Sequence, residues 1–223
     1  MRPGSPENAA GQETARAAPS AAVPPARTAT DTAALVLSGV ASPFLVLPAF
    51  AVAITARYSP DWRVFLLWSG VSVLFSSGFP LLYVLAGIRV GRITDVHVMR
   101  REQRCGPFVV ALLSTAAGTA VLSALGAPLA LVAPGISMVA NGILFGLVSL
   151  RWKISLHPSV FAGAVICSAF LLQGWLAWLL LLLPGIVWAR VRRTRHSVAQ
   201  GVVAVLLAGV VTLGVLYVCG FVC

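Results

Sequence analysis

Acidic side chains are scarce in this chain. Six Asp and Glu residues stand against sixteen Lys and Arg residues in a length of 223, and no acidic residue lies inside an apolar segment. Sites for Mg²⁺ or Ca²⁺ need several oxygen ligands, mostly carboxylates, so no metal of this kind is expected. A proton or cation relay across a membrane also uses acidic groups. Their absence disfavours a small transporter.

Cysteines are also few. The four of them form neither a CxxC pair nor a spacing typical of metal ligands: Cys105, Cys167, Cys219 and Cys223. We interpret them as small side chains in or near helices, and they do not fix a redox compartment. The sequence therefore predicts no metal site and no cofactor.

Charged residues make up only 10% of the chain and hydrophobic residues 59%, whereas a soluble domain has about 25% charged residues. Runs of about 20 apolar residues, long enough to cross a bilayer, recur after residue 32. They predict an all-α, polytopic transmembrane helical bundle of about six to seven spans. The count stays open because the sixth segment is short and directly joined to the fifth. We place the segments at 33–56, 62–88, 108–125, 128–150, 154–173, 174–189 and 198–221.

The first 32 residues differ from the rest of the chain. They are polar and rich in Ala and Pro, a composition that cannot bury enough apolar surface to offset the entropy of ordering. Residues 1–32 are therefore predicted to be a disordered tail, and 33–223 the transmembrane domain. No apolar stretch precedes Ala33, so we expect no signal peptide.

The basic residues are distributed unevenly about the predicted spans. Arg57 and Arg63 fall on one side, and the other fourteen Lys and Arg residues fall in the tail and three connections on the opposite side. The positive-inside rule then predicts a cytoplasmic N-terminus, in an integral protein of the cell (plasma) membrane. The net charge of +10 is accounted for by lipid headgroups at these connections, so nucleic acid is not an expected partner.

One histidine lies in or directly beside each of the three basic connections: His97, His157 and His196. All three should therefore lie at the same face of the membrane. Arginine forks match phosphate oxygens and remain charged at any working pH. A neutral imidazole can attack phosphorus, and a second can protonate the leaving oxygen. This set of residues is suited to phosphoryl transfer without a metal.

Three groups of residues carry a resemblance to a known enzyme family. Arg190 and His196 stand at an Arg-x5-His spacing, residues 155–157 read Ser-Leu-His, and Arg104 lies in the first connection. The set resembles the motifs Ser-Arg-x5-His-x3-Asp, Pro-Ser-Gly-His and Lys-x6-Arg-Pro of the type 2 phosphatidic acid phosphatase superfamily. These are integral membrane lipid-phosphate phosphatases. The resemblance covers about residues 87–212.

The resemblance implies a membrane-embedded phosphatase that hydrolyses a lipid phosphate or a polyprenyl (di)phosphate without a metal. His196 would be the nucleophile that forms a phosphohistidine, and His157 would be the general acid. The substrate phosphate would be held by Arg104, Arg190 and Ser155. Lys153 is not a motif residue, but it lies two positions before Ser155 and would add positive charge.

The chain departs from the family pattern at several positions. Gln200 replaces the aspartate that orients the nucleophilic histidine; its carbonyl can accept a hydrogen bond but cannot stabilise an imidazolium as a carboxylate does. His97 replaces the first-motif lysine, which leaves it either a phosphate contact or a solvated loop residue. The other departures are Cys105 for proline, Leu156 for glycine and Ala189 for serine.

Two alternatives remain beside the enzyme. Taken alone, residues 190–197 have the composition of a cationic collar that anchors a helix at the headgroups. Leu156 and Gln200 also permit a catalytically impaired relative that binds anionic lipid or a partner protein. The identity of the lipid phosphate and the oligomeric state do not follow from the sequence.

Overall fold

The computed structural model describes residues 28–94, 103, 105–152 and 154–222. Within these ranges the chain is helical and contains no strand, which confirms the predicted all-α class. The elements, in chain order, are α1 (Ala29–Val40), α2 (Pro43–Tyr58), α3 (Trp62–Val73), the π-helical η1 (Leu74–Gly78), α4 (Phe79–Arg89), α5 (Cys105–Ala124), α6 (Leu129–Ser149), α7 (Leu156–Leu171), the 3₁₀-helical η3 (Gly174–Leu182), α8 (Leu183–Arg192) and α9 (Val198–Val218).

The helices are long and apolar enough for a membrane protein. Five continuous stretches of the described chain could each span a bilayer, and α1 and α2 together make a sixth, bent by 45°. α7 has 16 residues, slightly below the usual minimum for a full span. By length and composition the chain thus has five to six spans, with α7 as a shorter apolar helix. The five stretches are Trp62–Arg89, Cys105–Ala124, Leu129–Ser149, Gly174–Arg192 and Val198–Val218.

The first apolar segment, expected at 33–56, is two helices rather than one. α1 begins at Ala29, inside the predicted tail, because Thr28 and Asp31 form a capping box that satisfies its first backbone N–H groups. Pro43 then occupies the first turn of α2, where its missing N–H is tolerated. The chain therefore changes direction between α1 and α2.

The short sixth segment is lengthened by its helix type. η3 is a 3₁₀-helix of nine residues, followed by ten residues of α8. A 3₁₀-helix rises about 2.0 Å per residue against about 1.5 Å in an α-helix, so the stretch reaches about 33 Å. The three-residue repeat also aligns Trp175, Trp178 and Leu181, which are 64%, 71% and 70% exposed, on one face suited to lipid.

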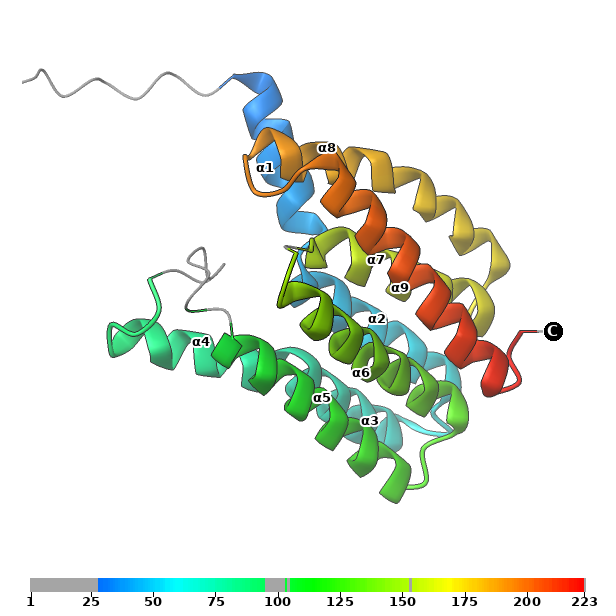
Figure 1. Ribbon diagram of the computed structural model, residues 1–223. Helices are drawn as coiled ribbons and strands as arrows, with labels where there is room; N and C mark the ends of the chain where they lie inside the picture. Colours follow the sequence, from blue (N-terminus) through cyan, green and yellow to red (C-terminus); the bar gives the residue numbers. More distant parts are fainter. Residues whose placement is uncertain (1–27, 95–102, 104, 153, 223) are drawn as a thin grey trace, which may run out of the picture.

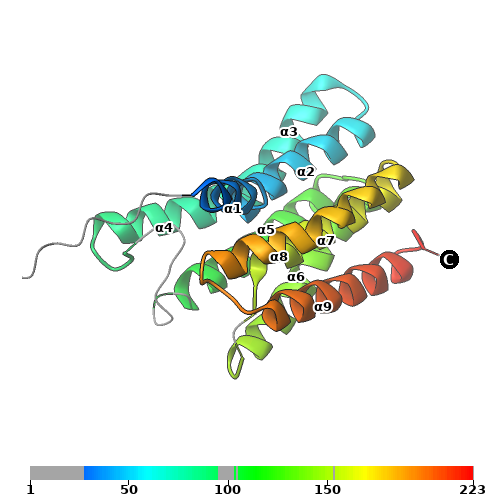
Figure 2. The ribbon, with the colours of Figure 1, turned by 90° about the horizontal axis from the view of Figure 1, so that it is seen from above.

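The bundle places the basic helix ends together. Figures 1 and 2 show the C-terminal ends of α4, α6 and α8 and the N-terminal ends of α1, α5, α7 and α9 at one end of the molecule, which we call the basic end. The turn between α2 and α3 and the chain's C-terminus lie at the opposite end. Segments far apart in the sequence thus bring their polar termini to one face.

Small and polar side chains hold the helices close together inside the bundle. The buried face of α9 carries Gly201, Ala204, Ala208 and Thr212. Thr212 Oγ1 accepts hydrogen bonds from Ser137 Oγ at 3.1 Å and from Asn141 Nδ2 at 3.2 Å, both on α6. Small residues allow close backbone approach in membranes, and such hydrogen bonds link the helices. These contacts fix α9 against α6 inside the bundle.

Four helices end in the same hydrogen-bonded turn, and one of them is strained. At Gly91, Gly126 and Gly220 the turn has a positive φ of 72° to 78°, which glycine adopts freely. The turn after α8 has Thr194 at this position, with a φ of 52°. Its hydrogen bonds run from Thr194 N to Val191 O and from Arg195 N to Arg190 O. A β-branched residue in this conformation is a genuine outlier.

We expect Thr194→Gly to stabilise the protein, because glycine removes a steric cost of about 1–2 kcal/mol at this positive φ. Part of this gain is offset, because glycine has more backbone entropy to lose on folding. Thermal unfolding in detergent should show a midpoint raised by a few degrees. Gly126→Ala, the reverse change in an equivalent turn, should lower it. A lower midpoint for Thr194→Gly would show that the threonine makes a compensating contact.

Candidate functional site

The start of α7 carries the second predicted motif. Ser155 is the N-cap residue of α7 and is fully buried, and its Oγ has no hydrogen-bond partner among the described residues. His157 lies in the first turn and is half-buried. Leu156, between them, is 37% exposed. The leucine at the expected glycine position therefore does not fill the buried space beside Ser155.

The last turn of α8 places an arginine against this motif. Arg190 is only 9% exposed. Its Nη1 lies 3.5 Å from Nε2 of His157 and donates a hydrogen bond to Ser38 Oγ at 3.0 Å. A guanidinium has no acceptor atom, so this contact requires His157 to accept at Nε2 and to carry its proton on Nδ1. The structure thus joins two predicted motifs that are 33 residues apart.

α1 supplies a residue that the sequence analysis missed. Ala34, Ser38 and Ala41 form a buried stripe on this helix, and Figure 1 shows α1 lying beside α8. Because these side chains are small, α1 packs closely enough for Ser38 to contact the guanidinium of Arg190. A serine in an apolar run is common in membrane helices, so the sequence held no signal that singled it out.

A second contact joins the same two helices near the surface. Arg192 Nε lies 3.0 Å from Asp31 Oδ1, and the two side chains are 47% and 39% exposed. An exposed pair of this kind contributes about 0–1 kcal/mol. Arg192, which belongs to the cationic segment 190–197, therefore links the end of α8 to the start of α1.

The turn between α8 and α9 orients His196. Ser197 is the N-cap of α9 and forms a capping box with Gln200: Gln200 N donates to Ser197 Oγ at 3.2 Å, and Ser197 N donates to Gln200 Oε1 at 3.1 Å. The second bond identifies Oε1 as the carbonyl oxygen, because a backbone N–H needs an acceptor. The same Oε1 lies 3.3 Å from His196 Nδ1.

This geometry fixes the tautomer of His196. Nδ1 must donate its hydrogen to the Gln200 carbonyl, so in the neutral ring Nε2 carries the lone pair. Gln200 was expected to orient the histidine weakly; it has this contact and also caps α9. The S-x-x-Q pattern of residues 197–200 is a capping-box signature that was available in the sequence and was not used.

The remaining predicted positions are located as follows. Arg104, Lys153 and His97 lie outside the described residues. Cys105, at the start of α5, is exposed. No group of three or more His, Cys, Asp or Glu side chains that could hold a metal occurs in the described part of the chain.

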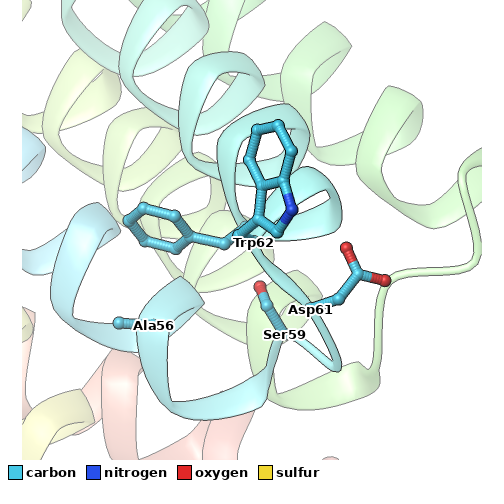
Figure 3. A pocket seen from close by; sticks show the side chains of 5 residues that line it. Ala56, Ser59, Asp61 and Trp62 are labelled. Carbon is cyan, nitrogen blue, oxygen red and sulfur yellow. The ribbon is translucent and has the colours of Figure 1, made fainter.

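A shallow hollow lies at the opposite end of the bundle (Figure 3). It has a volume of about 250 Å³ and is lined by Ala56, Ser59, Asp61, Trp62 and Phe65. The Asp61 carboxylate accepts hydrogen bonds from the backbone N–H groups of Arg63 and Val64 and so caps α3. A carboxylate repels phosphate, and this hollow is no alternative site for such a ligand.

Searches with the sequence and the structure found no matching family model, no matching curated protein and no matching solved structure.

Two variants separate the functions of the Gln200 carbonyl. Ser197→Ala and Gln200→Ala should each destabilise the protein by about 1 kcal/mol, because each removes a capping hydrogen bond. Only Gln200→Ala should release His196 from the Nδ1–H tautomer, a change visible in the ¹⁵N shifts of labelled histidine. If Ser197→Ala altered the His196 shifts equally, the carbonyl contact would not govern the tautomer.

Proposed function

We propose that the protein is a membrane-embedded phosphatase that hydrolyses a lipid phosphate or a polyprenyl (di)phosphate, with lipid as its partner and no metal. The observation that carries the proposal is the contact of Arg190 with His157 at 3.5 Å. In the turn that follows Arg190, Nδ1 of His196 lies 3.3 Å from the Gln200 carbonyl oxygen, so the neutral ring has its lone pair on Nε2. These are the arginine and the two histidines that the family resemblance assigns to phosphoryl transfer. Arg104, Ser155 and Lys153 are the further phosphate-binding residues of the proposal, and His97 is a weaker candidate.

The reaction would proceed in two steps. His196 Nε2 attacks phosphorus and forms an N–P bond while the bond from phosphorus to the lipid oxygen breaks, and the imidazolium of His157 gives that oxygen a proton. Water then attacks the phosphohistidine, His157 accepts a proton from this water, and the N–P bond breaks. Arg190 stabilises the charge on the phosphoryl oxygens throughout.

The contact between Arg190 and His157 suggests how the acid is charged. A hydrogen bond from the guanidinium to Nε2 needs the neutral ring, because a protonated ring has no acceptor atom. A phosphate group bound between the two would replace this contact and place negative charge beside the ring. Negative charge favours the imidazolium, so substrate binding would itself prepare the general acid.

Phosphate release from detergent-solubilised protein tests the reaction. A panel should contain phosphatidic acid, polyprenyl phosphate and polyprenyl diphosphate. We expect release by the wild type and a loss of at least about a hundredfold in His196→Ala and His157→Ala, with Arg193→Ala, a charge of the same turn, as the control. Equal rates in the wild type and His196→Ala would refute catalysis.

A second candidate is a relative that binds lipid phosphate without hydrolysing it. Gln200 favours this candidate. Its neutral carbonyl oxygen accepts hydrogen bonds from both His196 Nδ1 and the backbone N–H of Ser197. A neutral carbonyl stabilises an imidazolium less than a carboxylate does. Binding of phosphatidic acid that survives His196→Ala, is lost in Arg190→Leu and is accompanied by no turnover would identify this function.

We further propose that the basic end faces the cytoplasm of a cell whose plasma membrane holds the protein, as the arginine distribution indicates. The resemblance favours the opposite face, since family members usually have extracytoplasmic sites. In a variant whose sole thiol is Cys105, a membrane-impermeant maleimide should label Cys105 only after the cells are opened. A chain with Trp62→Cys as its sole thiol, 66% exposed at the other end, should label in sealed cells. Rapid labelling of Cys105 in sealed cells would overturn this orientation.

A further inference from the structure

The proposed phosphate site is closed in this structure. Arg190 is 9% exposed, Ser38 is 2% exposed and Ser155 is fully buried. A phosphate oxygen has to reach the guanidinium at hydrogen-bond distance to be clamped. A ligand therefore cannot bind Arg190 in this arrangement unless a neighbouring element moves.

α1 is the element best placed to move. Ser38, on α1, contacts the guanidinium directly. α1 packs against α8 and, less extensively, against α2, whereas α7 packs against α2, α6, α8 and α9. α1 is joined to α2 by a break with a 45° bend, at Ala41–Pro43. Figure 1 shows α1 beside α8 at the basic end. Its other polar contact with α8 is the exposed pair of Asp31 and Arg192.

We propose that α1 is a gate whose Ser38 occupies the position that a phosphate oxygen takes on Arg190. This inference rests on the proposed phosphate site and adds its regulation. The gate opens by rotation about Ala41–Pro43, which separates Ser38 from Arg190 and Asp31 from Arg192. Phosphate and α1 then compete for one guanidinium.

The strengths of the contacts favour a gate that ligand can open. The hydroxyl of Ser38 is a neutral acceptor that takes one hydrogen bond from the guanidinium, whereas a phosphate is charged and can accept two parallel hydrogen bonds from the arginine fork. The exposed pair of Asp31 and Arg192 adds little. A phosphate monoester, with two negative charges and two oxygens in reach of the fork, therefore replaces Ser38, whereas a zwitterionic headgroup offers one charge and does so less well.

A reversible lock tests the gate. In a chain with the four native cysteines replaced by serine, Leu37→Cys and Gly185→Cys join α1 to α8; a Cβ built at Gly185 lies 3.2 Å from Leu37 Cδ2. The matched control is Ile166→Cys with Gly209→Cys, which joins α7 to α9, where the corresponding distance is 3.8 Å. Binding of phosphatidic acid in nanodiscs and of inorganic phosphate is measured before and after oxidation, and again after reduction.

Oxidation of the 37–185 pair should weaken binding of the phosphate probe at least about tenfold, and reduction should restore it; oxidation of the control pair should change nothing. Phosphatidic acid should also slow formation of the 37–185 disulfide relative to phosphatidylcholine.

Asp31→Asn should tighten binding of the phosphate probe by about twofold to fivefold, and Asp61→Asn, at the opposite end, should leave it unchanged. Binding of inorganic phosphate alone would identify a site for free phosphate rather than for a lipid headgroup, with the gate retained.

Two results would overturn the gate and have different meanings. Equal affinities in the oxidised and reduced 37–185 pair, with binding still lost in Arg190→Leu, would remove the gate and leave the phosphate site. Absence of binding in every state, including Asp31→Asn, would refute the proposed phosphate site and the gate with it.

Discussion

The basic end of the molecule is organised around one buried charge, the guanidinium of Arg190. A charge taken out of water is costly unless polar groups surround it, and here Ser38 of α1 and His157 of α7 approach the same nitrogen. The position in the last turn of α8 is also favourable, because the C-terminal end of a helix attracts cations. Helices α1, α7 and α8 therefore converge at the one side chain, Arg190, whose buried charge needs polar contacts.

The connection that follows this arginine is unusually constrained. Five residues separate Arg190 from His196 and contain a helix-ending turn with Thr194 at positive φ. The capping box of α9 begins directly after His196, at Ser197. Strain of this kind persists where the surrounding structure determines the conformation, and such positions cluster at functional sites. The turn fixes where α9 starts, and the capping residue Gln200 fixes the ring of His196.

The length of α7 differs from that of the stretch that runs beside it. α7 has 16 residues, or about 24 Å at about 1.5 Å per residue, which is short of a hydrocarbon layer of about 30 Å. Its end at Leu171 is held by a hydrogen bond from Tyr58 Oη to the Leu171 carbonyl, and its beginning at Ser155 lies among neighbouring helices. The neighbouring stretch of η3 and α8 is lengthened by 3₁₀ geometry. The beginning of α7 and the end of α8 thus meet where Arg190 contacts His157.

Much of the architecture followed from the sequence, because apolar runs of span length have few alternatives in a membrane. They predicted a helical bundle and assigned His157, Arg190 and His196 to one end. The pairing of His196 with Gln200 was also within reach, since the two residues lie four positions apart at the start of α9. The sequence could not show that Ser38 contacts Arg190, or that Leu156 is exposed beside a buried Ser155. Those features depend on which faces of distant helices meet, and only tertiary packing decides that.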